Sequence, residues 1–213
     1  MSLLIGTLVI LLGYLFGSIP SAYIIGSLKG IDMASDDDDG RLGASLSFHK
    51  LGLVSGIVVG LMDLTKGIMT VVVARVLGMP LELVLLAGLA AVAGHNWSIF
   101  LGFKGGRGTM VSYGVLISLA FWSLFLALAV AGIFLFFTHK STLATVITMS
   151  LLSIMLWAQS TVRFWPALPW EPGITPWVVI LPLTLLIPNL LKYVQIRDKE
   201  YLSERRQAPA ERP

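Results

Sequence analysis

Long apolar stretches constrain this 213-residue chain more than any other feature. A helix needs about 20 apolar residues to cross a bilayer. Hydrophobic residues make up 56% of the chain and charged residues 13%, which is too apolar for a soluble core under a polar surface. We therefore expect an all-α integral membrane protein. Five stretches are close to spanning length: Leu3 to Ile25, Leu51 to Val73, Pro80 to Phe100, Thr142 to Ala158 and Trp177 to Leu191.

A sixth apolar stretch, Val111 to Phe137, is too long for one upright span. As a single helix it would measure roughly 40 Å, so it is either one tilted span or two short ones. A division near Ser118 to Ser123 agrees better with the charges. One long span would export Lys140 and the basic C-terminal tail, against the preference for positive residues on the cytoplasmic side.

The divided stretch gives seven predicted spans, the fourth of them short, with the positive charges gathered on one side. Only Arg75 and Arg163 fall on the other side. We expect an outside N-terminus, a cytoplasmic C-terminus, one seven-helix domain over residues 1–196 and a charged cytoplasmic tail over residues 197–213. The cytoplasmic positive residues are Lys29, Arg41, Lys50, Lys104, Arg107, Lys140, Lys192 and those from Arg197 onward.

The segment "FKGGRG" puts a cationic, glycine-rich loop between two apolar stretches. Gly105, Gly106 and Gly108 permit backbone conformations that turn amide N–H groups toward a ligand, and Lys104 and Arg107 add positive charge. Such a nest suits a phosphate group. The alternative is a flexible turn whose basic residues only anchor the cytoplasmic side.

Asp63 and Lys66, in "LMDLTKG", lie one helical turn apart and well inside the second apolar stretch. Charges at that depth are costly unless they are paired or face a polar cavity, so they mark a candidate functional site. The alternative is a structural ion pair that holds helices together.

His95 and Asn96, in "AGHNW", fall at the cytoplasmic end of the third stretch, next to the glycine loop. This position favours a role at a phosphate site, although a histidine can equally be a packing residue. The acidic run Asp36 to Asp39 is expected to be a solvated loop, with Mg²⁺ or Ca²⁺ binding as the alternative. The chain has no cysteine, which excludes disulfides, thiolate metal sites and a thioester-forming nucleophile.

Three ordered motifs resemble those of the bacterial acyl-phosphate:glycerol-3-phosphate acyltransferases, which are membrane-integral enzymes. They are "GYLFGSIPSAYIIGSLKGID", "LMDLTKG" and "GHNWSIFLGFKGGRGTM". The resemblance implies transfer of a fatty acyl group from acyl phosphate to the 1-hydroxyl of glycerol 3-phosphate. The products would be lysophosphatidic acid and phosphate, formed at the cytoplasmic face of a bacterial inner membrane. It also implies no metal, no cofactor and no nucleic-acid partner.

The resemblance suggests roles for individual residues. His95, Lys104, Asp63 and Lys66 would be catalytic, with His95 assisting proton movement. The remaining expected substrate-binding residues are Arg41, Ser45, His49, Asn96, Gly105, Gly106, Arg107, Gly108, Thr142 and Lys192.

The first family motif, G-S-G-N-x-G-A-T-N-x-x-R, departs from the pattern here. Asp39 stands in the place of its serine, Arg41 of its first asparagine, Leu46 of its second asparagine and His49 of its arginine. These changes leave two alternatives open: a paralogue that uses another acceptor, and a non-catalytic permease or scaffold. No internal repeat or pair of matching broken helices supports a transporter.

Overall fold

A computed structural model describes residues 3–33, 42–138, 141–161 and 176–207 of this chain. The described residues form helices joined by short turns, with one isolated backbone bridge between Ser98 and Lys104. The α-helices are α1 (Leu3–Ser18), α2 (Ser21–Leu28), α3 (Ala44–Leu51), α4 (Leu53–Val76), α5 (Leu81–Asn96), α6 (Thr109–Ile117), α7 (Phe121–Thr138), α8 (Ser141–Thr161) and α9 (Pro176–Gln207). A 3₁₀ turn, η2 (Ile99–Leu101), follows α5.

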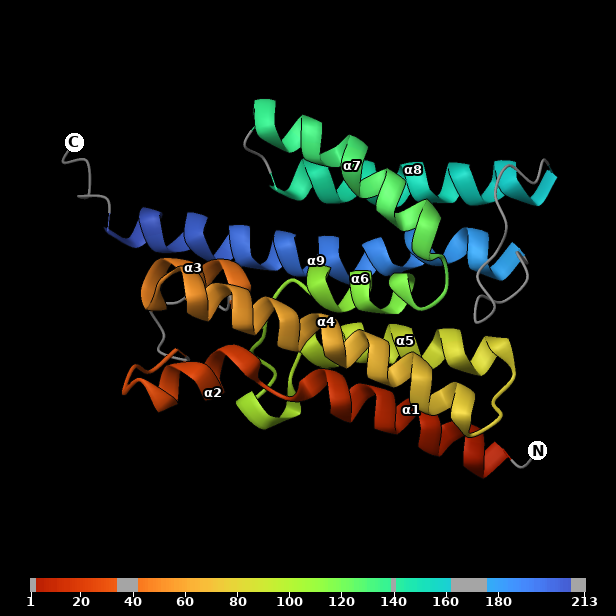
Figure 1. Ribbon diagram of the computed structural model, residues 1–213. Helices are drawn as coiled ribbons and strands as arrows, with labels where there is room; N and C mark the ends of the chain where they lie inside the picture. The colour runs from red at the N-terminus through yellow and green to blue at the C-terminus, as the bar shows by residue number, and fades with distance from the viewer. Residues whose placement is uncertain (1–2, 34–41, 139–140, 162–175, 208–213) are drawn as a thin grey trace.

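The long helices lie side by side along one common direction (Figure 1). The start of α1 and the end of α9 are at opposite ends of the bundle. The short helices α2 and α3 lie at the same end as the C-terminal part of α9. The connection between α5 and α6 lies toward the same end of the bundle.

The first apolar stretch is broken rather than continuous. α1 ends at Ser18 and α2 begins at Ser21, with Ile19 and Pro20 between them. Proline has no backbone N–H and cannot continue the hydrogen-bond ladder of a helix. The predicted span from Leu3 to Ile25 corresponds to the apolar segment Leu4–Leu28, and the break inside it was not predicted.

The division of the sixth apolar stretch is confirmed. α6 ends at Ile117 and α7 begins at Phe121, within the predicted interval. With nine residues, α6 is only roughly 13 Å long. It is therefore too short to cross a bilayer by itself and packs inside the bundle between α4, α5 and α9.

Five helical segments among the described residues are long and apolar enough to span a membrane. They are Leu4–Leu28, Leu53–Val76, Phe121–Thr138, Thr142–Ser160 and Pro176–Asp198. α5 is apolar but shorter, with 16 residues. Large apolar side chains such as Leu4, Val54 and Phe125 are exposed around the bundle, as expected where lipid replaces water. The finding is a multi-pass α-helical membrane fold, and the seven-span count stays a prediction.

Small residues allow the inner helices to approach closely, as is common in membrane bundles. On α1, an added Cβ at Gly17 would lie 1.9 Å from the carbonyl oxygen of Ala91 on α5. On α6, a Cβ at Gly114 would lie 2.0 Å from the carbonyl oxygen of Leu64 on α4. These two contacts fix α1 against α5 and α6 against α4.

The last helix extends well beyond its predicted apolar stretch, which ended at Leu191. α9 runs to Gln207 and so includes much of the segment expected to be a tail. Pro182 and Pro188 lie inside α9. This extension brings additional residues of α9 into the candidate site.

Candidate active site

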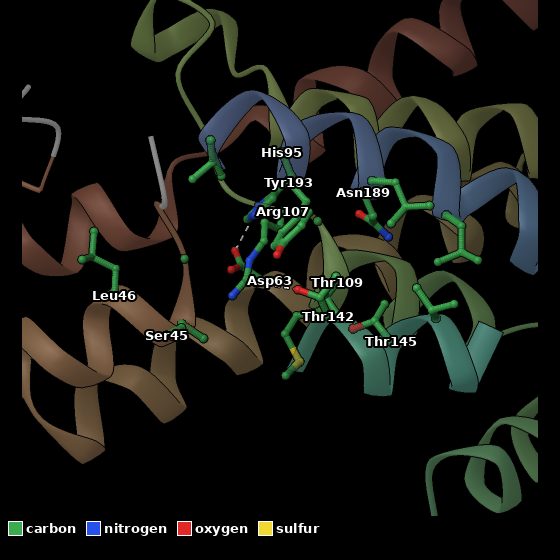
Figure 2. Close-up of a pocket in the computed structure, with 18 of the residues that line it drawn as sticks. Ser45, Leu46, Asp63, His95, Arg107, Thr109, Thr142, Thr145, Asn189 and Tyr193 are labelled. Atoms are coloured by element: carbon green, nitrogen blue, oxygen red, sulfur yellow. Dashed lines mark hydrogen bonds and ion pairs between the residues drawn. The ribbon is translucent and has the colours of Figure 1, made fainter. Parts of the chain in front are cut away.

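A cavity of about 420 Å³ lies between α3, α4, α5, α6, α8 and α9. Figure 2 shows Asp63, His95, Arg107 and Tyr193 at its centre, with Ser45 on one side and Thr142 and Asn189 on the other. Its full lining is Gly43, Ala44, Ser45, Leu46, His49, Asp63, His95, Arg107, Gly108, Thr109, Met110, Thr142, Thr145, Val146, Leu186, Asn189, Leu190, Tyr193, Ile196 and Arg197.

Asp63 anchors a buried polar network below this cavity. Its carboxylate Oδ1 accepts hydrogen bonds from Lys66 Nζ at 2.7 Å and from Ser21 Oγ at 2.9 Å. Both members of the ion pair are buried, with Asp63 2% and Lys66 6% exposed. The predicted pairing is therefore present, and it keeps two charges satisfied at a depth where an isolated charge would be costly.

The same network satisfies the backbone that Pro20 interrupts. Lys66 Nζ also donates to the carbonyl oxygen of Ile19, at the break between α1 and α2. Ser98 Oγ donates to the carbonyl oxygen of Ser18 at 2.6 Å. Non-helical backbone within a membrane bundle is tolerated only where such partners exist. The ion pair thus connects α4 to the broken first segment.

His95 connects this network to the cavity. Its Nδ1 lies 3.6 Å from Asp63 Oδ1, and the imidazole lines the cavity wall. Figure 2 shows the two side chains side by side. A carboxylate beside one imidazole nitrogen fixes the orientation of the ring and stabilises its protonated form. We call Asp63, Lys66, Ser21 and His95 the cavity floor.

Arg107 supplies positive charge at the centre of the cavity. Its Nη1 donates to Thr142 Oγ1 at 3.4 Å, which links the α5–α6 turn to α8. The next residue, Gly108, precedes α6 with φ of 72° and lines the cavity together with Thr109 and Met110. The N-terminal end of α6 therefore faces the cavity, and the amide N–H groups of its first turn, which have no partner within the helix, and the helix dipole favour an anion there.

One face of α9 forms a long wall of the cavity. Its lining residues recur at intervals of three and four, which places them on a single helical face. Figure 2 shows Tyr193 close to Arg107. These residues are Leu186, Asn189, Leu190, Tyr193, Ile196 and Arg197.

Exposed polar residues surround the opening of the cavity. Ser45 and His49 come from α3 and Arg197 from α9, and all three are exposed while lining the cavity. We call these three residues the cavity rim. Arg41, the other predicted cationic residue of this region, and the run Asp36 to Asp39 lie outside the described residues.

Lys104 does not line this cavity, unlike Arg107. Its side chain is exposed, and its carbonyl oxygen accepts a hydrogen bond from Ser98 N at 3.2 Å. The preceding Gly102 and Phe103 both have positive φ, 59° and 63°. This tight turn directs the chain back along Ser98. The expectation that Lys104 and Arg107 converge on one pocket is therefore not met by the geometry.

Gly105 and Gly106 serve close packing rather than an open phosphate nest. An added Cβ at Gly105 would lie 2.2 Å from the carbonyl oxygen of His95, and one at Gly106 would lie 2.3 Å from His95 Nε2. The N–H of Gly106 donates to His95 O at 3.1 Å, so it is already engaged. Both glycines line a smaller adjoining cavity with His95. Their small size lets the loop lie directly against the histidine.

Asn96 and Lys192 are buried beside the cavity and do not line it. Asn96 Nδ2 donates to Pro188 O on α9 at 2.9 Å, which joins α5 to α9. Lys192 Nζ lies 5.9 Å from the centroid of the Trp97 ring. Trp97 Nε1 also donates to Gln195 Oε1 at 3.2 Å. These contacts hold α9 in place against the end of α5.

Five polar residues of the site were missed from the sequence: Ser21, Thr109, Thr145, Asn189 and Tyr193. Pro20 inside an apolar stretch was a signal for a break with polar neighbours. The spacing of Asn189, Tyr193 and Arg197 by four residues was a second signal. That pattern is visible only if the last helix is allowed to continue past Leu191.

The sequence matches the model of a known protein family. Residues 7–197 match the family model for glycerol-3-phosphate acyltransferase. The chain belongs to this family. The predicted resemblance is therefore confirmed over most of the sequence.

Curated glycerol-3-phosphate acyltransferases share about two fifths of the matched residues with this family member. The glycerol-3-phosphate acyltransferase 2 of Moorella thermoacetica is 42% identical over 128 residues, which are 58% of this chain and 65% of that relative. The Parasynechococcus marenigrum enzyme is 39% identical over 150 residues, 68% of this chain and 70% of the relative. The Bacillus velezensis enzyme is 41% identical over 142 residues, 66% of this chain and 72% of the relative. These matches span about two thirds of each relative.

Two solved structures share the fold of this family member. Both are of PlsY (YgiH), an integral membrane glycerol 3-phosphate acyltransferase, in a lysophosphatidic acid form and a glycerol 3-phosphate form. The first has a TM-score of 0.66 at 24% identity and covers 92% of this chain and 90% of that chain. The second has a TM-score of 0.64 at 22% identity and covers 91% and 92%. This similarity establishes the membrane-integral fold.

Proposed function

We propose that this protein transfers a fatty acyl group from acyl phosphate to the 1-hydroxyl of glycerol 3-phosphate in phospholipid synthesis. The hydroxyl oxygen attacks the acyl carbonyl carbon and forms the new ester bond. The bond from that carbon to the phosphate oxygen breaks, and inorganic phosphate leaves. The hydroxyl proton is taken up by a base, and lysophosphatidic acid is the second product.

The observation that carries this proposal is the mixed chemistry of one cavity in a membrane fold. Arg107, Thr142 and the N-terminal end of α6 face it with positive charge and hydrogen-bond donors. Apolar side chains, among them Val146 and Leu186, line it as well. Such a cavity can bind a phosphate group and a fatty chain together, because the cationic side binds the phosphate and the apolar side packs against the chain.

We assign the proton transfer to His95. It lines the cavity, and its Nδ1 faces Asp63 at 3.6 Å. Proton uptake from the attacking hydroxyl would give an imidazolium that the Asp63 carboxylate stabilises. Lys66 and Ser21 hold that carboxylate in position through hydrogen bonds to its Oδ1. These four residues therefore act as one unit.

The protein does not need to form a covalent acyl intermediate, because the phosphate of an acyl phosphate is already a good leaving group. The catalytic contribution of the cavity is to hold the hydroxyl close to the acyl carbonyl in the correct orientation. Arg107 and the α6 amides would also stabilise the negative charge that develops on the carbonyl and on the departing phosphate.

The proposed topology has seven spans in a bacterial inner membrane, an outside N-terminus and a cavity that opens to the cytoplasm. The opposite positions of the start of α1 and the end of α9 support it. So does the concentration of lysine and arginine near α2, α3 and the end of α9. The chain has no cysteine, so the single variants Lys29→Cys and Arg75→Cys can each be tested with an impermeant thiol reagent. We expect the reagent to reach position 75 from outside the membrane and position 29 only from the cytoplasmic side. Equal access of an impermeant reagent to both positions would contradict this topology.

The direct test uses purified protein in lipid nanodiscs with acyl phosphate and labelled glycerol 3-phosphate. We expect labelled lysophosphatidic acid and an equal amount of released phosphate, both abolished by omission of either substrate. Phosphate release that requires a different polyol phosphate would indicate the paralogue with another acceptor. Uptake of glycerol 3-phosphate into vesicles without any acyl transfer would instead indicate a permease. Either result would overturn the proposed reaction.

A further inference from the structure

We propose that the turn between α5 and α6 inserts into the lipid bilayer through Ile99, Phe100 and Phe103. We call these three residues the apolar tip. Their side chains are 49%, 58% and 60% exposed. Large apolar side chains that are exposed together mark an interaction surface. This surface lies outside the cavity, so the inference concerns a membrane contact and goes beyond the proposed reaction.

The level of the turn along the bundle favours lipid as its partner. The 3₁₀ turn η2 packs against α1, and Leu101 lines a small cavity together with Ile19 and Pro20. Ile19 and Pro20 lie inside the apolar segment Leu4–Leu28, and the 8-residue α2 follows them. That helix continues the segment by roughly 12 Å. The turn is therefore level with the interior of a spanning segment and not with its end.

The helices beside the turn present apolar side chains as well. Leu12 and Leu15 on α1 and Ile24 on α2 are exposed, as expected where lipid surrounds a helix. In Figure 1 the yellow-green turn η2 lies beside the break between α1 and α2, on the side of the bundle away from α7 and α8. The apolar tip thus continues the lipid-facing surface of the first spanning segment.

The backbone of the turn is strained at Phe103, which has φ of 63°. A bulky residue rarely adopts this left-handed conformation, and such strain persists only where the surroundings offset it. Transfer of an exposed phenyl ring from water into the bilayer is favourable and would offset it. The turn is closed by hydrogen bonds from Phe103 N to Ser98 O at 2.8 Å and from Lys104 N to Leu101 O at 3.1 Å. These bonds satisfy backbone groups that lipid could not.

Lys104 gives the apolar tip a cationic end. Its side chain is exposed and does not line the cavity. A lysine at such a boundary lays its methylene groups along apolar surface and extends its ammonium group to the lipid phosphates. Apolar side chains combined with a cation are typical of segments that lie in the membrane interface. The partner that fits this surface is therefore a layer of phospholipid.

The test measures the membrane depth of spin labels on the full-length protein. The chain has no cysteine, so Phe100→Cys and Phe103→Cys each carry a single label. Lys29→Cys is the control for water, and Phe125→Cys, at an exposed position of α7, is the control for lipid. Each labelled protein is checked by size-exclusion chromatography and placed in nanodiscs of phosphatidylcholine and phosphatidylglycerol. Relaxation of the label by oxygen, which concentrates in hydrocarbon, is compared with relaxation by a water-soluble nickel complex.

We expect the ratio of oxygen to nickel relaxation at positions 100 and 103 to be close to the value at position 125. It should be several-fold above the value at position 29. A ratio equal to that at position 29 would place the apolar tip in water and overturn the proposal. Spectral broadening between labels on two copies of the chain would show that a second copy covers the tip, and would overturn it as well.

Two further labelled variants extend the test. Ile99→Cys is judged by the same ratios if the variants at positions 100 and 103 do not fold. Lys104→Cys should give a ratio between those at positions 29 and 100, because this position is expected at the level of the lipid phosphates. A higher ratio at position 104 than at position 100 would contradict the proposed orientation of the turn. These measurements do not use acyl transfer, so their outcome is independent of the proposed reaction.

Discussion

The floor and the rim of the cavity differ in the solvent exposure of their charged residues. On the floor, Asp63 and Lys66 are buried, and the Asp63 carboxylate is bonded to Lys66 on its own helix and to Ser21 on α2. On the rim, Ser45, His49 and Arg197 are exposed to solvent. A buried charge needs fixed partners, whereas an exposed charge can exchange them with water.

This difference indicates where the protein can vary. A change at Asp63 removes the partner of the buried Lys66, and a change at Lys66 also releases the backbone carbonyl of Ile19. A change on the rim alters which anion is attracted and leaves the helices in place. The rim also contains His49, which stands where the first motif of the resemblance has an arginine. Asp63, Lys66 and His95 lie instead within "LMDLTKG" and "GHNWSIFLGFKGGRGTM", two of the motifs that carry the resemblance. We therefore expect stability and chemistry to depend on the floor, and acceptor preference on the rim.

The strongest test of this contrast is Asp63→Asn. It leaves Lys66 buried without its carboxylate, which is expected to cost about 3–5 kcal/mol of stability. Turnover should fall with it, since His95 loses its neighbour at 3.6 Å. Thermal unfolding in detergent and the acyl transfer assay measure the two effects.

The double variant Asp63→Asn with Lys66→Met separates structure from chemistry. Removal of both charges should recover part of the lost stability, because no unpaired charge stays buried. Turnover should remain low. Recovery of both would show that the pair is only structural, and the floor would lose its proposed catalytic role.

The next largest effect is expected for His95→Gln. The side chain keeps hydrogen-bonding capacity and loses the ability to take up a proton near neutral pH, so kcat should fall by about a hundredfold. The KM values and thermal stability should change little. A kcat within a few-fold of the wild type would exclude His95 as the base and leave proton uptake to a substrate phosphate.

A smaller effect on stability is expected for Gly114→Ala. The added methyl group would lie 2.0 Å from the carbonyl oxygen of Leu64 and push α6, which carries the end that faces the cavity, away from α4. We expect a loss of about 1–3 kcal/mol and a lower turnover. Gly132→Ala on α7 is the matched control, because nothing lies within 4 Å of its added Cβ. Equal thermal stability of the two variants would contradict the packing described for α6.

The smallest effect is expected for Lys104→Ala. Its side chain is exposed and lies outside the cavity lining, so activity should stay within about twofold of the wild type, as for most surface changes. The sequence motif predicts a phosphate-binding lysine at this position instead. A large rise in the KM for either substrate would support that prediction over the geometry.

Several parts of the site could be predicted because they depend on local chemistry. The depth of Asp63 and Lys66 in an apolar stretch required a partner, and three residues of spacing made them neighbours on one helix. The charge distribution divided Val111 to Phe137 at the right place. Arg107 and His95 were found through their motif and Thr142 through the family resemblance, and all three line the cavity.

Which other side chains face the cavity depended on how each helix is rotated about its axis and on where it ends. The hydrophobic periodicity of the sequence fixes neither. Lys104 and Arg107 are three residues apart in one loop, yet only Arg107 faces the cavity, since the turn at Gly102 and Phe103 has positive φ. Gly105 and Gly106 looked like an open nest and instead pack against His95.

The sequence by itself determined a multi-pass helical membrane protein with paired buried charges and a cationic loop, because apolar length and charge depth are properties of the chain. Only the tertiary structure decided which side chains share the cavity. α9 was expected to end near Leu191, and its continuation brings Tyr193 and Arg197 to the site. A helix can contribute a wall only when its neighbours fix its length and its rotation, and those neighbours come from distant parts of the sequence.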